Sequence, residues 1–202
     1  MPSRLIFVRH GLTIWNYEFR YQGHTDIELS EEGIAQAQAL QKRLSTEKPS
    51  AIYSSDLRRA WQTAQIIAEA FGLPVNLLPE LREINFGVWE GLTYRDLEKN
   101  YPELLKTWLE TPDQLVIPGG ETFAMVQERA LKAVKDIAQQ YPDDTVIMVT
   151  HGGTIAAILC GLQGEHLSSM WKYKHGNTAV TILRVDKNRT VVEILNDTSH
   201  LV

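Results

Sequence analysis

Two histidines stand in the same local pattern, each directly after an apolar run of β-forming residues and directly before glycine. His10 follows the run 5–8 and Arg9, and His151 follows the run 145–149 and Thr150. Imidazole can act as a nucleophile, a general acid or base, or a metal ligand. Because parallel strands of an open α/β sheet end at a shared edge where ligands bind, two histidines placed this way can converge on one ligand. The repeated pattern therefore predicts a functional site at that edge.

The residues around both histidines favour an anion as the ligand. Glycine after each histidine lets the backbone approach a ligand closely. The apolar run 154–162 predicts a helix after Gly153, and its free amide hydrogens and dipole would attract an anion, above all phosphate. The sequence has no His-x-His, His-Glu-x-x-His or Cys-x-x-Cys spacing and no Walker-type phosphate loop. We therefore expect a phosphate site with no metal and no cofactor.

Two buried strands must position these histidines. The runs 5–8 and 145–149 are apolar throughout, as is typical of strands covered on both faces, and we expect them to be central and parallel. Other strands are predicted over 51–53 and 75–78, with a C-terminal hairpin over 179–185 and 191–195 whose turn spans 186–189. The sheet should then be mixed, with antiparallel strands at one edge.

Amphipathic helices are predicted between these strands. Apolar residues recur at helical spacing over 57–71 and 123–141, and Ser30 followed by two glutamates predicts the start of a helix running to about residue 44. We expect an α/β three-layer sandwich with a mostly parallel central sheet and an antiparallel C-terminal edge hairpin. Residues 1–202 should form a single domain, with a cap or insertion at 92–118, where prolines separate short helical pieces.

The composition argues against several kinds of partner. The formal net charge of -5 and the isoelectric point near 5.7 disfavour a nucleic-acid surface, which needs a basic stripe. The N-terminal apolar run ends at Arg9 and is too short for a signal peptide or a membrane span. The single cysteine, Cys160, lies in an apolar run and is interpreted as a buried structural thiol. We expect a cytoplasmic protein without nucleic-acid or membrane partners.

Stretches from nearly the whole chain resemble, in order, the motifs of one enzyme family. The segment Leu-Ile-Phe-Val-Arg-His-Gly-Leu-Thr-Ile-Trp-Asn at 5–16 is similar to the opening signature of the histidine phosphatase superfamily, which includes the cofactor-dependent phosphoglycerate mutases. The resemblance continues through residues 20–23, 26–33, 53–64, 81–91, 118–121, 150–153 and 195–201. It implies a phosphoglycerate mutase-like fold and a metal-independent phosphomonoesterase.

The resemblance also implies roles for the site residues. His10 matches the nucleophile that becomes phosphorylated, and Glu83 matches the proton donor to the leaving oxygen, which later acts as the base for water. Arg9, Arg59 and His151 match the groups that hold the phosphoryl oxygens and stabilise their charge. Because the nucleophile must be neutral, we expect the neighbouring arginines to hold the pKa of His10 down.

Other residues are assigned less directly. Adjacent Arg58 and Arg59 would point about 100° apart on a helix, so spacing alone does not choose between them. The family pattern Ser-Asp-Leu-x-Arg-Ala selects Arg59. Contacts with substrate are implied for Asn16, Gln22, Gly23 and Gly152. Without the resemblance, ordinary loop capping explains Asn16 and Gln22 equally well. The histidines that match no catalytic position are expected at the surface or in loops: His24, His166 and His175.

The family resemblance leaves the reaction and the substrate partly open. A phosphohistidine can pass its phosphoryl group to water or return it to a sugar acid. The chain is shorter than the typical mutase, and Glu-Ile-Asn-Phe-Gly at 83–87 departs from the mutase-like Glu-Arg-His-Tyr-Gly, so a phosphatase is favoured. A small phosphorylated metabolite is expected as substrate. Phosphoserine is preferred because Tyr-Pro-Glu at 101–103 and Trp108, which precede Gly-Gly-Glu at 119–121, resemble the histidine-type phosphoserine phosphatases. Alternatives are a phosphoglycerate mutase, an α-ribazole phosphatase, a fructose-2,6-bisphosphatase, or a non-catalytic module that binds a phospho-ligand. A homodimer is compatible with the family.

Overall fold

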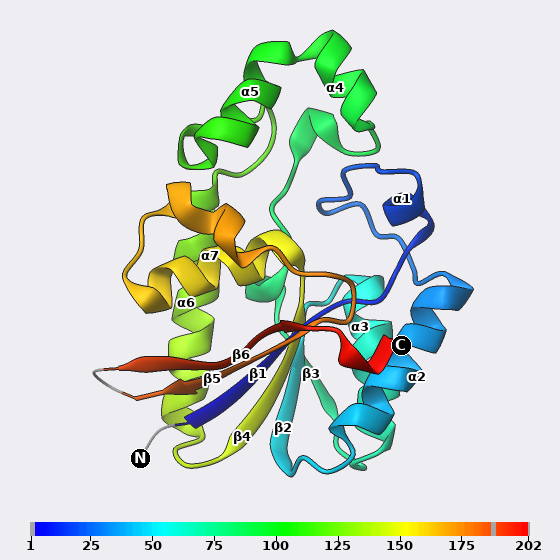
Figure 1. The fold of residues 1–202 in the computed structure, drawn as a ribbon, viewed down its shortest axis with the longest axis vertical. Coiled ribbons are helices and arrows are strands. Elements are labelled where there is room, and N and C mark those ends of the chain that lie inside the picture. The colour runs from blue at the N-terminus through cyan, green and yellow to red at the C-terminus, as the bar shows by residue number, and fades with distance from the viewer. Residues whose placement is uncertain (1–2, 187–188, 202) are drawn as a thin grey trace.

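The strands form one mixed sheet in the computed structural model, which describes residues 3–186 and 189–201. Within these residues the sheet has six strands in the order β3-β2-β4-β1-β5-β6 (Figure 1). The parallel strands are β1 (Ser3–Arg9), β2 (Pro49–Ser54), β3 (Val75–Leu77) and β4 (Thr145–Thr150). The antiparallel hairpin is β5 (Val180–Val185) and β6 (Thr190–Asp197). The predicted mixed sheet is confirmed, although residues 187–188 of the predicted turn lie outside the described residues.

The pairing of β1 with β4 aligns the ends of the two central strands. The strands are parallel, and Arg9 lies opposite Thr150 in their register. The backbone N–H of His10 donates to the carbonyl oxygen of Thr150 at 3.0 Å, which extends the pairing one residue past β1. His10 and His151 therefore leave the sheet side by side at its carboxyl edge, as the sequence pattern predicts.

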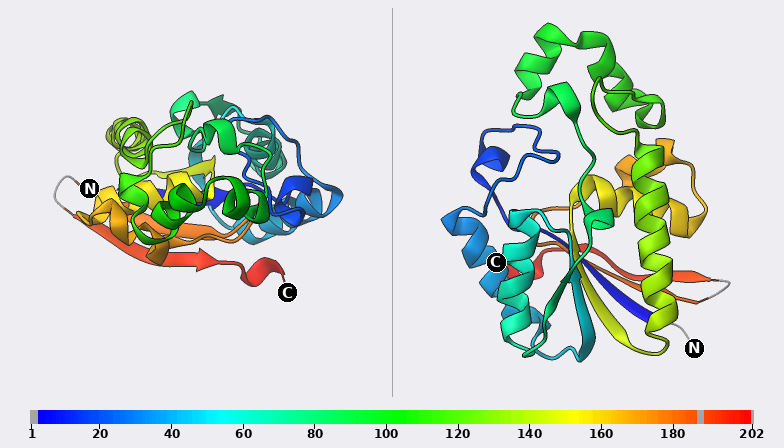
Figure 2. Two further views of the ribbon diagram at one scale, coloured as in Figure 1. Left: turned by 90° about the horizontal axis from the view of Figure 1, so that it is seen from above. Right: turned by 180° about the vertical axis from the view of Figure 1, so that it is seen from behind.

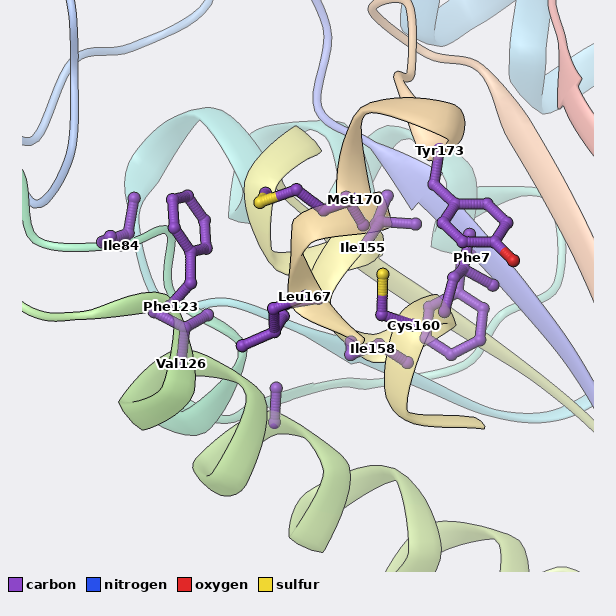
Figure 3. Packing of buried hydrophobic residues seen from close by; sticks show 14 of the residues in the cluster. Phe7, Ile84, Phe123, Val126, Ile155, Ile158, Cys160, Leu167, Met170 and Tyr173 are labelled. Atoms are coloured by element: carbon purple, nitrogen blue, oxygen red, sulfur yellow. The ribbon is translucent and has the colours of Figure 1, made fainter. Parts of the chain in front are cut away.

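Helices cover both faces of the sheet and produce three layers (Figure 1 and Figure 2). Side chains that alternate along the strands divide the core: Ile6 and Val8 face α2 (Glu31–Leu44) and α3 (Arg58–Glu69). Leu5 and Phe7 face α6 (Phe123–Gln140) and α7 (Gly152–Gln163). Figure 3 shows this second core, in which Cys160 packs among apolar side chains. Cys160 is fully buried, as predicted.

The helix boundaries follow local capping. Ser30 caps α2 by accepting the backbone N–H of Gly33, in agreement with the predicted start. Helix α7 begins at Gly152, two residues earlier than the apolar run indicates, because His151 has an extended backbone and serves as the N-cap. Among the described residues, no helix has the length and apolarity needed to cross a membrane.

The segment 92–118 lies beyond the carboxyl edge of the sheet, at the top of Figure 1. It contains α4 (Tyr94–Asn100), α5 (Pro102–Glu110) and a short 3-10 helix at Pro112–Gln114, so two of its prolines start helical elements. Trp108 of α5 contacts Trp171 with ring centroids 4.6 Å apart. The other short helices are Ile14–Tyr17, Pro79–Leu81, Gly87–Trp89, Leu167–Tyr173 and Ser199–Leu201.

Truncation of Leu40 tests the packing of α2 on the sheet. Leu40 is fully buried, so we expect Leu40→Ala to lower the free energy of unfolding by about 3 kcal/mol through lost transfer energy and a residual cavity. Leu109 in α5 is 50% exposed, and Leu109→Ala should cost less than about 1 kcal/mol. Urea unfolding at neutral pH measures both changes. Equal losses in the two variants would contradict the assigned burial.

Candidate active site

His10, for which the sequence predicts the role of nucleophile, is a buried histidine at the carboxyl edge of the sheet. Its side chain is 3% exposed, and Nδ1 lies 2.7 Å from the carbonyl oxygen of Gly11. A carbonyl only accepts, so Nδ1 carries the hydrogen and Nε2 of the neutral ring keeps its lone pair. The backbone carbonyl of His10 accepts from Asn177 Nδ2 and from the N–H of Thr178. Ring and backbone are thus both held, and Nε2 accepts no hydrogen bond from the residues that the structure describes.

The surroundings of His10 favour its neutral form. Burial lowers the pKa of His10 well below 6.5, and the charges of Arg59 and Arg9 lower it further. The hydrogen bond to Gly11 acts in the opposite direction but does not prevail. The direction agrees with the sequence-based expectation, which named the arginines. Burial, the larger cause, depends on the tertiary structure.

Two guanidinium groups line the cavity with His10, that of the buried Arg59 and that of the partly buried Arg9. Arg59 is fully buried and donates through Nη1 to the carbonyl of Thr25 at 3.0 Å and through Nη2 to that of Gly23 at 2.7 Å. Arg9 donates through Nη1 to the carbonyl of His175 at 2.6 Å. In each arginine Nε is buried with no hydrogen-bond partner among the described residues. Since a guanidinium carries five N–H donors, both retain donors for an anion.

The structure also distinguishes Arg59 from its neighbour. The side chain of Arg58 is 59% exposed and pairs with Asp26 at 3.4 Å, away from the buried cluster. Burial lowers the pKa of Arg59 to about 10, although Glu83 and Asp26 oppose the shift. The guanidinium therefore remains charged at neutral pH.

The ring of His151 lies beside that of His10. It is fully buried, and its ring centroid is 5.1 Å from that of His10. Nε2 contacts the hydroxyl oxygen of Ser55 at 2.9 Å, whereas Nδ1 has no partner among the described residues. Burial, followed by the charge of Arg59, lowers the pKa of His151 well below 6.5. The second histidine is thus neutral and has one uncommitted polar atom.

Two adjoining cavities open at this edge of the sheet. The smaller, about 140 Å³, brings together most of the predicted site residues, and its walls are Arg9, His10, Asn16, Arg20, Tyr21, Gln22, Gly23, Arg59, Glu83 and Phe86. The larger has a volume of about 280 Å³. Its lining includes Trp108, Trp171 and Lys174, as well as Gly152 and Gly153 at the start of α7. Arg9, Glu83 and Phe86 line both cavities. The smaller has the charge for a phosphoryl group and the larger has room for the rest of a substrate.

Glu83 stands where the cavities meet and is held by helix α7. Its carboxylate accepts from the N–H of Gly153 at 3.0 Å, and from the N–H of Thr154 at 3.1 Å and its hydroxyl at 3.2 Å. The sequence led us to expect a phosphate at this helix N-terminus. That expectation is wrong for these two amides, because a side chain of the protein already supplies the anion.

The remaining predicted contact residues differ in how they are placed. Asn16 accepts through Oδ1 from Asn177 Nδ2 at 3.3 Å and also bonds Thr13. Gln22 is 7% exposed, and its Oε1 is buried without a partner among the described residues. Gly23 has φ of +54°, and an added Cβ would meet the Glu90 carboxylate. Gly152 borders the larger cavity and lies against Arg9.

Sequence reasoning missed residues that build the site from a distance. Glu90 accepts from the N–H groups of His24 and Thr25 at 2.7 and 2.8 Å, and so holds the loop whose carbonyls bind Arg59. Arg129 donates to the carbonyl of Glu83 at 3.0 Å and pairs with Glu121. In the sequence, Glu90 lies within a family motif and Arg129 follows one, but no local pattern shows which group either side chain contacts.

His175 was expected at the surface or in a loop. It lies in a loop but is only 6% exposed. Its two ring nitrogens form hydrogen bonds with the Tyr173 carbonyl and the Thr181 hydroxyl, which satisfy the buried ring. Burial lowers its pKa to about 4. Its carbonyl holds Arg9, so this histidine supports the site through its backbone.

Comparison with known proteins places this geometry in a family. The family model for the histidine phosphatase superfamily (branch 1) matches residues 5–198. Phosphoserine phosphatase 1 of Hydrogenobacter thermophilus is 36% identical over 98% of this chain and 94% of its own. Glucosyl-3-phosphoglycerate phosphatase of Mycobacterium tuberculosis is 39% identical over 79% of this chain and 74% of its own.

A solved structure shares the whole architecture. A mutant phosphoserine phosphatase from Entamoeba histolytica, in complex with phosphoserine, superimposes with a TM-score of 0.90 at 33% identity, covering 99% of this chain and 100% of its own. This chain, whose smaller cavity brings together His10, Arg9, Arg59 and Glu83, belongs to the histidine phosphatase superfamily (branch 1) and is a phosphoric monoester hydrolase.

Proposed function

We propose that this enzyme hydrolyses phosphoserine or a close acidic relative through a phosphohistidine formed on His10, without a metal. The observation that carries the proposal is the placement of His10: Nδ1 is bonded to the Gly11 carbonyl, Nε2 has no hydrogen-bond partner among the described residues, and Arg9 and Arg59 wall its cavity. Burial and these two arginines lower the pKa of His10 and so favour its neutral ring. A nucleophile held this way needs no metal to activate it.

The residues of the two cavities account for both half-reactions. Glu83 takes up the proton of the bound phosphate monoanion; Nε2 of His10 then attacks phosphorus while the bond to the alcohol oxygen breaks, and Glu83 gives that proton to the alcohol oxygen. Arg9 and Arg59 stabilise the charge on the phosphoryl oxygens. Glu83, now a carboxylate, takes a proton from the attacking water as the N–P bond breaks. Inorganic phosphate leaves with that proton, and the neutral histidine and the Glu83 carboxylate are restored.

The larger cavity supports an acidic alcohol. Lys174 lines it, with Nζ 5.6 Å from the ring centroid of Trp171, and is the cation placed to meet a carboxylate there. Phosphoserine and glucosyl-3-phosphoglycerate, the substrates in the names of two relatives, both carry a carboxylate. Fructose-2,6-bisphosphate and α-ribazole phosphate do not. The cavity volume of about 280 Å³ is larger than the volume of a seryl group. The second candidate substrate is therefore a larger phosphate ester that also carries a carboxylate.

We further propose that the segment 92–118 is a cap within a single domain. Trp108 from this segment lines the larger cavity, so the cap would shape the alcohol site and leave the phosphate site unchanged. The homodimer and the cytoplasmic location expected from the sequence stay predictions.

The protonation state of His10 is directly measurable. Because the pKa of His10 is lowered in the folded protein, its ring should stay neutral as the pH falls through 6.5 and gain a proton only under more acidic conditions. NMR titration of the free enzyme, with His10→Ala to assign the signal, measures this. In the urea-unfolded protein, the pKa of the same ring should be about 6.5. Titration at 6.5 in the folded enzyme would contradict a neutral, buried nucleophile.

Removal of the Glu83 proton should separate the two half-reactions. For phosphoserine, whose alcohol is a poor leaving group, we expect Glu83→Gln to slow turnover about 10²- to 10⁴-fold. Nitrophenolate leaves without a proton, so p-nitrophenyl phosphate should give a rapid burst of one nitrophenol per enzyme, followed by slow release of phosphate. His10→Ala should show neither burst nor turnover. The absence of a burst in a correctly folded Glu83→Gln enzyme would argue against the assigned role.

Lys174 provides a test of substrate class. The initial rate of phosphate release in EDTA should be higher for phosphoserine than for 3-phosphoglycerate, α-ribazole phosphate or fructose-2,6-bisphosphate. Lys174→Met should raise KM about tenfold for the substrates that carry a carboxylate and leave KM for p-nitrophenyl phosphate unchanged. Lys172→Met is the matched control, because Lys172 pairs with Glu165 and does not line the cavity.

The same assay distinguishes the alternatives. Isomerisation of 3-phosphoglycerate without phosphate release would make the enzyme a mutase. Binding without any turnover would indicate a phospho-ligand module, and loss of activity in EDTA would contradict the metal-independent mechanism.

A further inference from the structure

We infer that Ser55 is a positioning residue that fixes the tautomer of His151, so that the neutral ring carries its hydrogen on Nδ1 and can donate it to the phosphoryl group. The inference rests on the proposed function for the identity of the acceptor. The tautomer itself is a property of the free protein.

Ser55 is held rigidly at the end of β2. Its hydroxyl is fully buried, 2.9 Å from His151 Nε2. Its own N–H donates to the carbonyl of Val149 at 2.9 Å, which ties it to the strand that carries His151. The hydroxyl oxygen also accepts the N–H of Leu57 at 3.3 Å. The position of this oxygen is therefore set by backbone contacts on both sides.

Accounting for the protons selects one arrangement. The lowered pKa of His151 leaves its ring with a single hydrogen. With that hydrogen on Nε2, it would donate to Ser55, and the hydroxyl hydrogen would have no acceptor in the hydrogen bonds described for this side chain. With the ring hydrogen on Nδ1, the hydroxyl donates to Nε2 while its oxygen accepts from Leu57. The second arrangement uses every donor except Nδ1–H.

The same device occurs elsewhere in the molecule, where its direction is unambiguous. His175 Nδ1 lies 2.8 Å from the carbonyl of Tyr173, so Nδ1 must carry the hydrogen. Its Nε2 then accepts from the Thr181 hydroxyl at 2.6 Å, and that oxygen accepts the N–H of Asn196 at 2.9 Å. A hydroxyl that accepts a backbone N–H and donates to histidine Nε2 is thus already present in this fold.

The consequence for the site is a neutral hydrogen-bond donor among buried cations. Nδ1 of His151 is buried without a partner among the described residues, in a ring 5.1 Å from that of His10. A protonated His151 could also donate, but it would add a third positive charge beside Arg9 and Arg59. Ser55 removes the need for that charge, and a phosphoryl oxygen satisfies the uncommitted N–H.

Nitrogen-15 NMR of histidine side chains in the free enzyme at pH 7.5 reads the tautomer directly. In the wild type we expect His151 with hydrogen on Nδ1 and none on Nε2. Ser55→Ala should shift the ring toward the Nε2–H form, raise the inhibition constant of inorganic phosphate, and lower kcat/KM about 10- to 100-fold, as loss of an orienting partner does. His151→Ala assigns the signals.

Ser54→Ala is the matched control. Ser54 is equally buried, but its hydroxyl donates to the carbonyl of Ser55 and does not contact His151. It should leave the His151 tautomer unchanged. Nε2–H in the wild type, or an unchanged tautomer and kcat/KM in a folded Ser55→Ala, would overturn the inference. If Ser55→Ala does not fold, the wild-type spectrum still shows which ring nitrogen of His151 carries the hydrogen, and Nε2–H there would overturn the inference. An Nδ1–H spectrum in an enzyme inactive on all phosphomonoesters would reject the proposed function and retain the tautomer.

Discussion

The parallel pairing of β1 with β4 is the constraint on which the site depends. Arg9 opposite Thr150 brings His10 and His151 to one point on the carboxyl edge, from segments more than half the chain apart. Each layer of the sandwich contributes to that edge: α3 supplies Arg59, and the N-terminus of α7 orients Glu83. A shift of the β1–β4 register by one residue would turn the side chains to opposite faces and separate the histidines.

The electrostatics of the site follow from burying positive charge without a full set of counterions. Arg9 and Arg59 are withdrawn from water, and burial lowers the pKa of both. Glu83 is the carboxylate that lines the cavities with them. Two neutral histidines limit the charge that the cluster must carry. The site is therefore prepared for a dianionic group, which replaces lost hydration with charge-assisted hydrogen bonds.

The cavities proposed for the phosphate and for the alcohol are built from different parts of the chain. The smaller cavity is built at the strand ends and in the loop 20–25, which Glu90 and Arg59 hold by its backbone. The larger cavity is walled by Trp108 from α5 and by Trp171 and Lys174 after α7. This separation explains how relatives with different substrate names can share one fold and one family signature.

The sequence by itself determined the layered α/β class, the two histidine-bearing strands and the boundaries of α2 and α6 to within a residue or two, because periodicity and capping are local. It also indicated Arg59 through a motif, whereas spacing left Arg58 equally eligible. Only the tertiary structure decided that Arg59 is buried while Arg58 faces solvent, and that Glu83 occupies the amides expected to bind phosphate. It likewise decided that Ser55, Glu90 and Arg129 form hydrogen bonds with His151, with the loop that holds Arg59, and with Glu83. Burial and hydrogen-bond partnership arise between residues such as Glu83 and Gly153, 70 positions apart, and no local pattern records which distant groups the fold brings together.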